Sequence, residues 1–134
     1  GQSQEGRAFI YHGSATGLST TPARTLETNE PGALFAEAVS GASDMNGDGF
    51  SDVIAGARTH TNGQAGEGAV YAYLGSATGV SATDFWQVES NQADANFGYS
   101  VASAGDVNGD GFSDVLVGAN GWDSLRLCYT DLKF

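Results

Sequence analysis

The chain has 134 residues, of which 40% are hydrophobic, so it is long enough for one domain and apolar enough to form a core. Sixteen acidic residues against five basic ones give a formal net charge of −11, which argues against nucleic-acid binding and against adsorption to an anionic membrane. Twenty glycines, two prolines and no sustained apolar pattern at helical spacing favour an all-β fold with many turns.

Short β-strands are expected in chain order at residues 7–13, 24–27, 37–42, 52–57, 69–75, 85–89, 99–104 and 114–119. The segment Val70–Leu74 is apolar on both alternating faces, so the sheet that contains it is expected to be covered on both sides. No segment approaches the length of a transmembrane helix, and the first residues lack the basic and apolar regions of a signal peptide.

The sequence contains a duplication. A shift of 62 residues aligns residues 5–62 with residues 67–124 without a gap, and almost half of the aligned positions are identical. A four-stranded sheet that is covered on both faces and repeated in tandem is typical of β-propeller blades. We therefore predict antiparallel four-stranded blades, about two per chain, within one unit spanning residues 1–134. A parallel β-helix ranks second, because its repeats are usually shorter.

Residues 125–134 form a tail without a counterpart in the repeat, and both a further strand and a frayed or foreign end are left open for it. The aligned copies begin with third and fourth strands and end with first and second strands. Such half-blades expose unpaired edges, and the halves of two chains complement each other. We therefore expect a homo-oligomer, specifically a cyclic trimer or tetramer.

Each copy contains the motif Asp-x-Asn-Gly-Asp-Gly-Phe-Ser-Asp, at Asp44–Asp52 and Asp106–Asp114. Oxygen donors at alternate positions of a tightly curled loop can converge on calcium, a hard cation that takes six to eight oxygens. This pattern predicts two Ca²⁺ sites per chain, with side-chain donors and the backbone carbonyls of the two Phe residues as ligands: Asp44, Asn46, Asp48, Phe50 and Asp52 in the first loop, and Asp106, Asn108, Asp110, Phe112 and Asp114 in the second.

Competing explanations of the loops are weaker. Asn-Gly and Asp-Gly pairs also form ordinary hairpin turns, but two full copies with three carboxylates each are improbable as turns alone. An EF-hand needs a glutamate at the twelfth position, where this chain has Ala55 and Val117, and it needs a following helix. Magnesium suits the loop less well, and zinc is disfavoured because no Cys or His is among the ligands.

The residues around the second loop resemble an FG-GAP repeat: Phe97-Gly98, then the acidic motif, then Val117-Gly118-Ala119. The first copy departs from this pattern with Phe35-Ala36. The resemblance covers about residues 5–124 and implies an integrin α-subunit-like β-propeller with calcium between the first two strands of a blade. Such propellers are usually seven-bladed, and the fold hosts adhesion proteins, lectins and accessory domains.

Other candidate sites are less favoured. His12 and His60 are not at metal-ligand spacing, so a surface or edge position is expected for both. Trp86 and Trp122 are expected to pack or to contact a neighbouring blade rather than to bind a ligand. The single cysteine, Cys128, excludes an intramolecular disulfide and a cysteine-based zinc cluster. No nucleophile or phosphate-binding motif indicates an enzyme.

These observations favour a calcium-stabilised binding or adhesion module without catalytic activity. An extracellular or cell-surface location is expected, because calcium is plentiful there. A protein or carbohydrate ligand is compatible with these observations, and neither nucleic-acid binding nor membrane insertion is expected. The alternatives are a carbohydrate-binding lectin and a self-assembling propeller fragment without a ligand.

Overall fold

The computed structural model describes residues 3–123 of the chain, and within this range all regular structure is β-strand. No helix there is long and apolar enough to cross a membrane. The strands are β1 (Ala8–Ile10), β2 (Gly13–Ser14), β3 (Gly17–Leu18), β4 (Arg24–Leu26), β5 (Phe35–Ser43), β6 (Asp52–Ala57), β7 (Ala69–Tyr73), β8 (Trp86–Glu89), β9 (Phe97–Gly105) and β10 (Asp114–Ala119).

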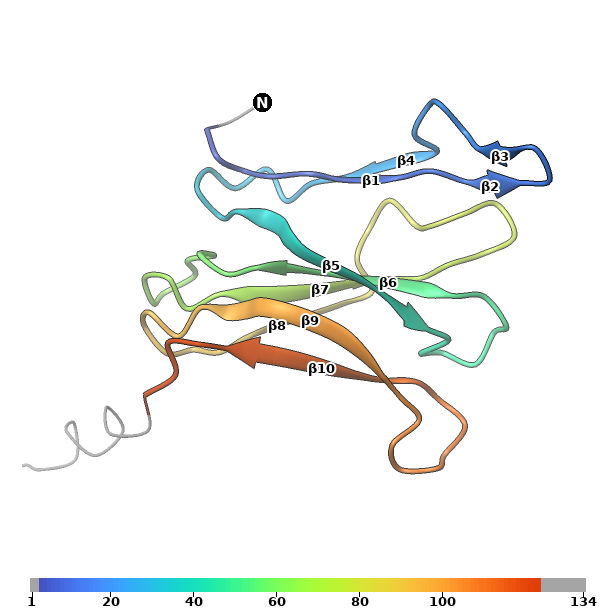
Figure 1. Cartoon of the computed structure of the whole chain (residues 1–134). Coiled ribbons are helices and arrows are strands. Elements are labelled where there is room, and N and C mark those ends of the chain that lie inside the picture. The colour runs from blue at the N-terminus through green and yellow to red at the C-terminus, as the bar shows by residue number, and fades with distance from the viewer. Residues whose placement is uncertain (1–2, 124–134) are drawn as a thin grey trace, which may run out of the picture.

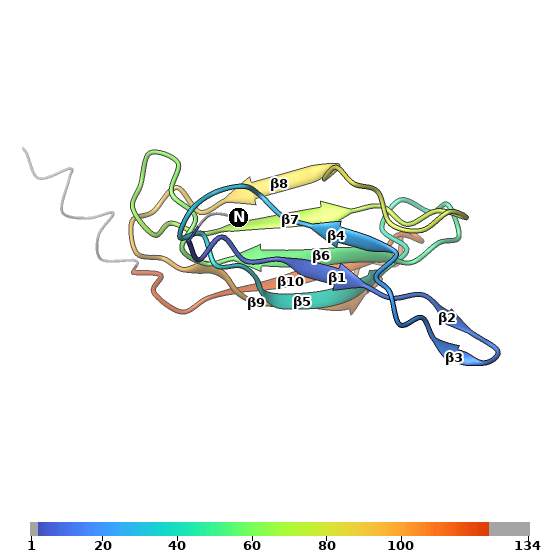
Figure 2. The ribbon, with the colours of Figure 1, turned by 90° about the horizontal axis from the view of Figure 1, so that it is seen from above.

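The strands form three stacked layers (Figure 1). The middle layer is a four-stranded sheet in the order β5-β6-β7-β8, and every pair in it is antiparallel. The pair β1-β4 lies on one side of it and the pair β9-β10 on the other. Viewed from above, the strands of the middle sheet lie side by side in sequence order (Figure 2). One complete blade therefore stands between two half-blades, and β2 and β3 form a small separate hairpin.

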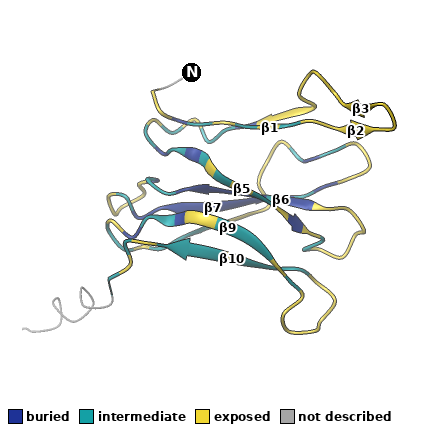
Figure 3. Cartoon of the chain, viewed as in Figure 1, coloured by how far each residue is buried: buried dark blue, intermediate teal, exposed yellow. Residues whose placement is uncertain are grey.

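The middle sheet is buried on both faces because its strands alternate between two cores. Ala55 of β6 and Tyr71 of β7 pack toward β1-β4, whereas Ile54 and Ala72 pack with Val101 and Val115 of the other half-blade. Every residue of β7 is buried, and the outer layers are more exposed (Figure 3). This burial confirms the prediction that both faces of the central sheet are covered.

Neighbouring blades approach so closely that one contact requires glycine on both sides. A Cβ at Gly56 of β6 would lie 2.1 Å from the carbonyl oxygen of Gly98 in β9. Gly98 also has a φ of +85°, a conformation that glycine adopts without strain. Its counterpart in the first copy is Ala36, which adopts a φ of 63° at a cost of about 1–2 kcal/mol. The glycine of the Phe-Gly pair thus allows the backbones of neighbouring blades to pack closely.

The all-β blade prediction is confirmed, and the antiparallel pairing rules out the parallel β-helix. The largest difference concerns the predicted strand at residues 7–13. The structure divides it into β1 and β2, because β1 pairs with β4 and the chain then turns into the β2-β3 hairpin. The unmatched tail at residues 125–134 lies outside the described residues.

Candidate functional site

The two acidic loops connect the first and second strands of consecutive blades. One joins β5 to β6, the other joins β9 to β10, and both lie at the same end of the layered structure (Figure 1). Each loop leads directly into a strand rather than a helix, which rules out the EF-hand.

The first carboxylate of each loop accepts hydrogen bonds from the backbone that curls around it. Asp44 Oδ1 accepts from the N–H groups of Gly47 at 2.7 Å and Asp48 at 3.0 Å, and its Oδ2 accepts from Gly49 N–H at 2.8 Å. In the second loop Asp106 Oδ1 accepts from Gly109 N–H at 2.7 Å. The glycine-rich sequence therefore fixes the curl of the loop through its own backbone donors.

The middle of the loop is organised by two further side chains. Asn46 Oδ1 accepts from Asp48 N–H at 3.1 Å, and Asp48 Oδ1 accepts from Phe50 N–H at 2.9 Å. Asn108 Oδ1 and Asp110 Oδ1 make the equivalent bonds in the second loop, at 3.1 and 2.9 Å. The backbone and side-chain geometry of the sequence motif is thus reproduced in both copies.

The last carboxylate of the motif anchors the loop to the sheet. Asp52 is only 1% exposed, and its Oδ2 accepts from Met45 N–H at 2.7 Å. Its Oδ1 accepts from Gly75 N–H at 2.8 Å, just beyond the end of β7. Asp114 keeps the first of these bonds, to Val107 N–H at 2.8 Å, but its blade has no described third strand to supply the second.

The loops touch each other across the blade boundary. Ser113 N–H donates to the Asp44 carbonyl oxygen at 2.9 Å. The ring of Phe112 lies against Gly47, where an added Cβ would be 2.8 Å from a ring carbon. This contact gives the two candidate sites a direct mechanical connection.

Backbone hydrogen bonds also set the electrostatics of the loops. The N–H groups of Gly49 and Gly111 hold the pKa of Asp44 and Asp106, respectively, below the usual value for aspartate, with additional loop N–H groups acting in the same direction. Burial opposes this shift in each loop and is the smaller effect. Both carboxylates are therefore ionised and available to a cation at neutral pH.

The chemistry of the donor set fits calcium, because every predicted ligand is an oxygen and each carboxylate has lone pairs beyond those used by the loop N–H groups. The three carboxylates of a loop do not all lie within 4.8 Å of one another, since each is bonded to its own stretch of backbone. The two Ca²⁺ sites and their ligands stay predictions.

The expectation that His60 lies at the surface or an edge is wrong. His60 is 7% exposed, and its two ring nitrogens face Glu30 and Glu89. The sequence did not reveal these contacts, because both glutamates lie about 30 residues away along the chain. Trp86 and Trp122 are 39% and 50% exposed, so the described residues bury neither of them fully.

The blade geometry and the paired acidic loops define a class: tandem β-propeller blades with an Asp-rich loop between their first two strands. Residues 44–117 match the FG-GAP-like repeat family, and the chain belongs to that family.

Similar proteins are integrin α-chains. Integrin alpha-5 of Xenopus laevis is 31% identical over 129 residues, which cover 92% of this chain. Integrin alpha-E of Mus musculus is 34% identical over 126 residues (87%), and integrin alpha pat-2 of Caenorhabditis briggsae is 32% identical over 123 residues (89%). The matches span only 12%, 11% and 10% of those proteins, respectively.

Proposed function

We propose that the chain is a calcium-stabilised, integrin-like propeller module that works by binding rather than by catalysis, outside the cytoplasm. The observation that carries the proposal is the acidic loop, whose N–H groups hold oxygen donors in the same arrangement twice. Calcium in these loops is structural: it neutralises three carboxylates and fixes the connection between two strands.

Thermal unfolding in calcium and in EDTA tests this proposal. A ligand that binds only the folded state stabilises it by about 2.7 kcal/mol at a hundredfold excess over Kd. Melting temperature is therefore expected to rise by several degrees in millimolar calcium, and to rise less in the same concentration of magnesium. Equal melting temperatures in calcium and EDTA would refute the structural role of the ion.

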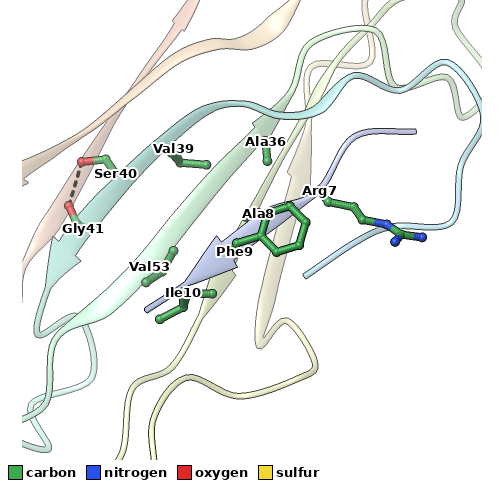
Figure 4. A pocket seen from close by; sticks show the side chains of 9 residues that line it. All are labelled: Arg7, Ala8, Phe9, Ile10, Ala36, Val39, Ser40, Gly41 and Val53. Atoms are coloured by element: carbon green, nitrogen blue, oxygen red, sulfur yellow. Dashed lines mark hydrogen bonds between the residues drawn. The ribbon is translucent and has the colours of Figure 1, made fainter. Parts of the chain in front are cut away.

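The half-blades support a proposal about assembly. Phe9 of β1 is 53% exposed on one outward face, and Leu116 of β10 is 66% exposed on the other. A cavity of about 530 Å³ opens between β1 and β5, lined by residues such as Phe9, Ile10 and Val39 (Figure 4). These exposed surfaces are apolar, and the equivalent surfaces of the complete blade are buried. We therefore expect each half-blade to be completed by strands of a second chain.

The repeat predicts how two chains would pair. Ala55 of β6 pairs with Tyr71 of β7, and the repeat places Val117 at the position of Ala55 and Phe9 at the position of Tyr71. Val117 of one chain should therefore lie opposite Phe9 of the next chain. A cyclic trimer or tetramer results from repeating this contact. Light scattering in calcium should give three or four times the monomer mass, and Phe9→Asp should lower it. A folded monomer would refute the ring. The strand edges would then have to be covered by further blades of a longer polypeptide.

The exposed tryptophans support carbohydrate as the second candidate ligand. Trp86 and Trp122 offer aromatic faces that could stack on a sugar ring. A glycan array in calcium distinguishes a lectin from a protein-binding module. A lectin gives selective signals that Trp86→Ala or Trp122→Ala abolishes. A protein-binding module gives none.

A further inference from the structure

A second group of metal-ligating side chains lies at the end of the blade opposite to the acidic loops. His60 lies in the β6-β7 connection, Glu67 comes just before β7, and Glu89 ends β8. In Figure 1 this connection and the turn after β8 are at the left, and the acidic loops are at the right. One ligand atom from each residue lies within 4.8 Å of the other two, and no other described group of His, Cys, Asp or Glu meets this criterion.

The histidine is surrounded by more negative charge than it can neutralise. Its Nδ1 contacts Glu30 Oε2, and its Nε2 lies 3.1 Å from Glu89 Oε1. A neutral imidazole donates from one nitrogen only, so one of these contacts has no proton to share. An imidazolium satisfies both contacts but supplies a single positive charge against three glutamates in one cluster.

Glu67 makes this imbalance costly. The residue is completely buried, and its Oε1 accepts from Asn62 N–H at 2.6 Å. Its Oε2 is also buried and has no hydrogen-bond partner among residues 3–123. A buried carboxylate oxygen without a partner is unfavourable unless a cation or a donor reaches it.

The repeat supplies an internal comparison. Glu67 and Glu89 correspond to Glu5 and Glu27 in the first copy. There Arg7 bridges the pair, with contacts of 3.1 Å to Glu5 and 2.6 Å to Glu27. The position equivalent to Arg7 is an alanine in the second copy, and the ion pairs of the described residues include no Arg or Lys on Glu67 or Glu89. Among residues 3–123, the same carboxylate pair thus has a fixed cation in one blade and none in the other.

We propose that His60, Glu67 and Glu89 bind a divalent transition-metal ion of the zinc type in place of that arginine. One spacing matches directly: ligands of a tetrahedral zinc ion lie about 3.3 Å apart, close to the 3.1 Å between His60 Nε2 and Glu89 Oε1. A carboxylate oxygen of Glu67 lies within 4.8 Å of a ligand atom of each of the other two residues. Glu30 on the opposite ring nitrogen is the carboxylate that orients a metal-bound histidine. An imidazole donor favours zinc over calcium, so the site is chemically distinct from the acidic loops.

Zinc titration in saturating calcium tests the site without interference from the acidic loops. The titration uses the Cys128→Ser variant, because this substitution removes the only thiol of the chain. Zinc binding is measured by competition with a chromogenic chelator. One zinc ion per chain is expected. His60→Gln and Glu89→Gln should each weaken binding at least tenfold, and Glu30→Gln should weaken it about 10–100-fold.

His12→Gln is the matched control, because it removes the other histidine of the chain, which is exposed, and should leave zinc affinity unchanged. Far-UV circular dichroism and calcium-dependent melting establish that each variant is folded, and Glu89→Gln remains informative if His60→Gln is not. Absence of saturable zinc binding to the folded chain would overturn the proposal and leave Glu30 and Glu89 as the partners of the His60 ring. Equal zinc affinity in folded His60→Gln or Glu89→Gln would overturn it as well.

Discussion

The two closing aspartates of the acidic loops have the same place in the motif but different structural surroundings, and this difference is measurable. Asp52 is 1% exposed and accepts two backbone hydrogen bonds, of 2.7 and 2.8 Å, one from its own loop and one from Gly75 beyond β7. Asp114 accepts one such bond, of 2.8 Å, and is only half-buried. Replacing each by alanine compares a fully buried anchor with a half-buried one.

The magnitude follows from these bonds. A hydrogen bond to a charged acceptor contributes about 1.5–3 kcal/mol, and a buried N–H left without a partner costs about 1–3 kcal/mol. Asp52→Ala should therefore lower the free energy of unfolding by about 3–5 kcal/mol. Asp114→Ala should lower it by only about 1 kcal/mol, since water replaces the lost acceptor. A loss of 3–5 kcal/mol is a large share of the 5–15 kcal/mol typical of a domain.

Urea denaturation in EDTA, followed by far-UV circular dichroism, isolates this effect from metal binding. Asp52→Asn is the matched control, because its amide keeps one acceptor oxygen and should give an intermediate loss. The same three variants in calcium then report the additional contribution of the ion. Equal losses for Asp52→Ala and Asp114→Ala in EDTA would refute the view that the bond to Gly75 anchors the loop to the sheet.

Further predictions concern single positions in the loops and blades. Asp110→Ala should remove one of two calcium ions in calorimetry, whereas Ser113→Ala should remove none, because only the Ser113 backbone is bonded; equal losses would contradict the ligand assignment. Ala36→Gly should raise unfolding free energy by about 0.5–1 kcal/mol by relieving its positive φ. Gly98→Ala should lower it by about 2 kcal/mol, because a Cβ would lie 2.6 Å from a β7 carbonyl oxygen. Because the pKa of Asp44 is lowered in the folded state, its carboxylate stabilises the fold above about pH 4, and this stabilisation is lost as pH falls through the folded-state pKa. Asp44→Asn should therefore make the free energy of unfolding depend less on pH in the acid range.

Much of the fold could be predicted because it depends on local sequence. Short apolar runs after the acidic loops placed β6 and β10 at their observed bounds, and the duplication identified the unit that repeats. The loop geometry was also local: Asp44 bonds to residues three to five positions ahead, so the motif contains both partners of each bond. A feature whose donor and acceptor share one short segment can be inferred without knowing the rest of the chain.

The sequence by itself determined the repeated blade, the acidic loops and the family resemblance. Only the tertiary structure decided what lies between blades. It showed that Gly56 and Gly98 are required by a backbone contact 42 residues apart in sequence. It also showed that His60 faces two glutamates, Glu30 in a loop and Glu89 at the end of β8, that no periodicity connects to it. The physical reason is that strand pairing brings distant segments together at the blade ends, and charge and packing there depend on side chains whose spacing along the chain carries no signal.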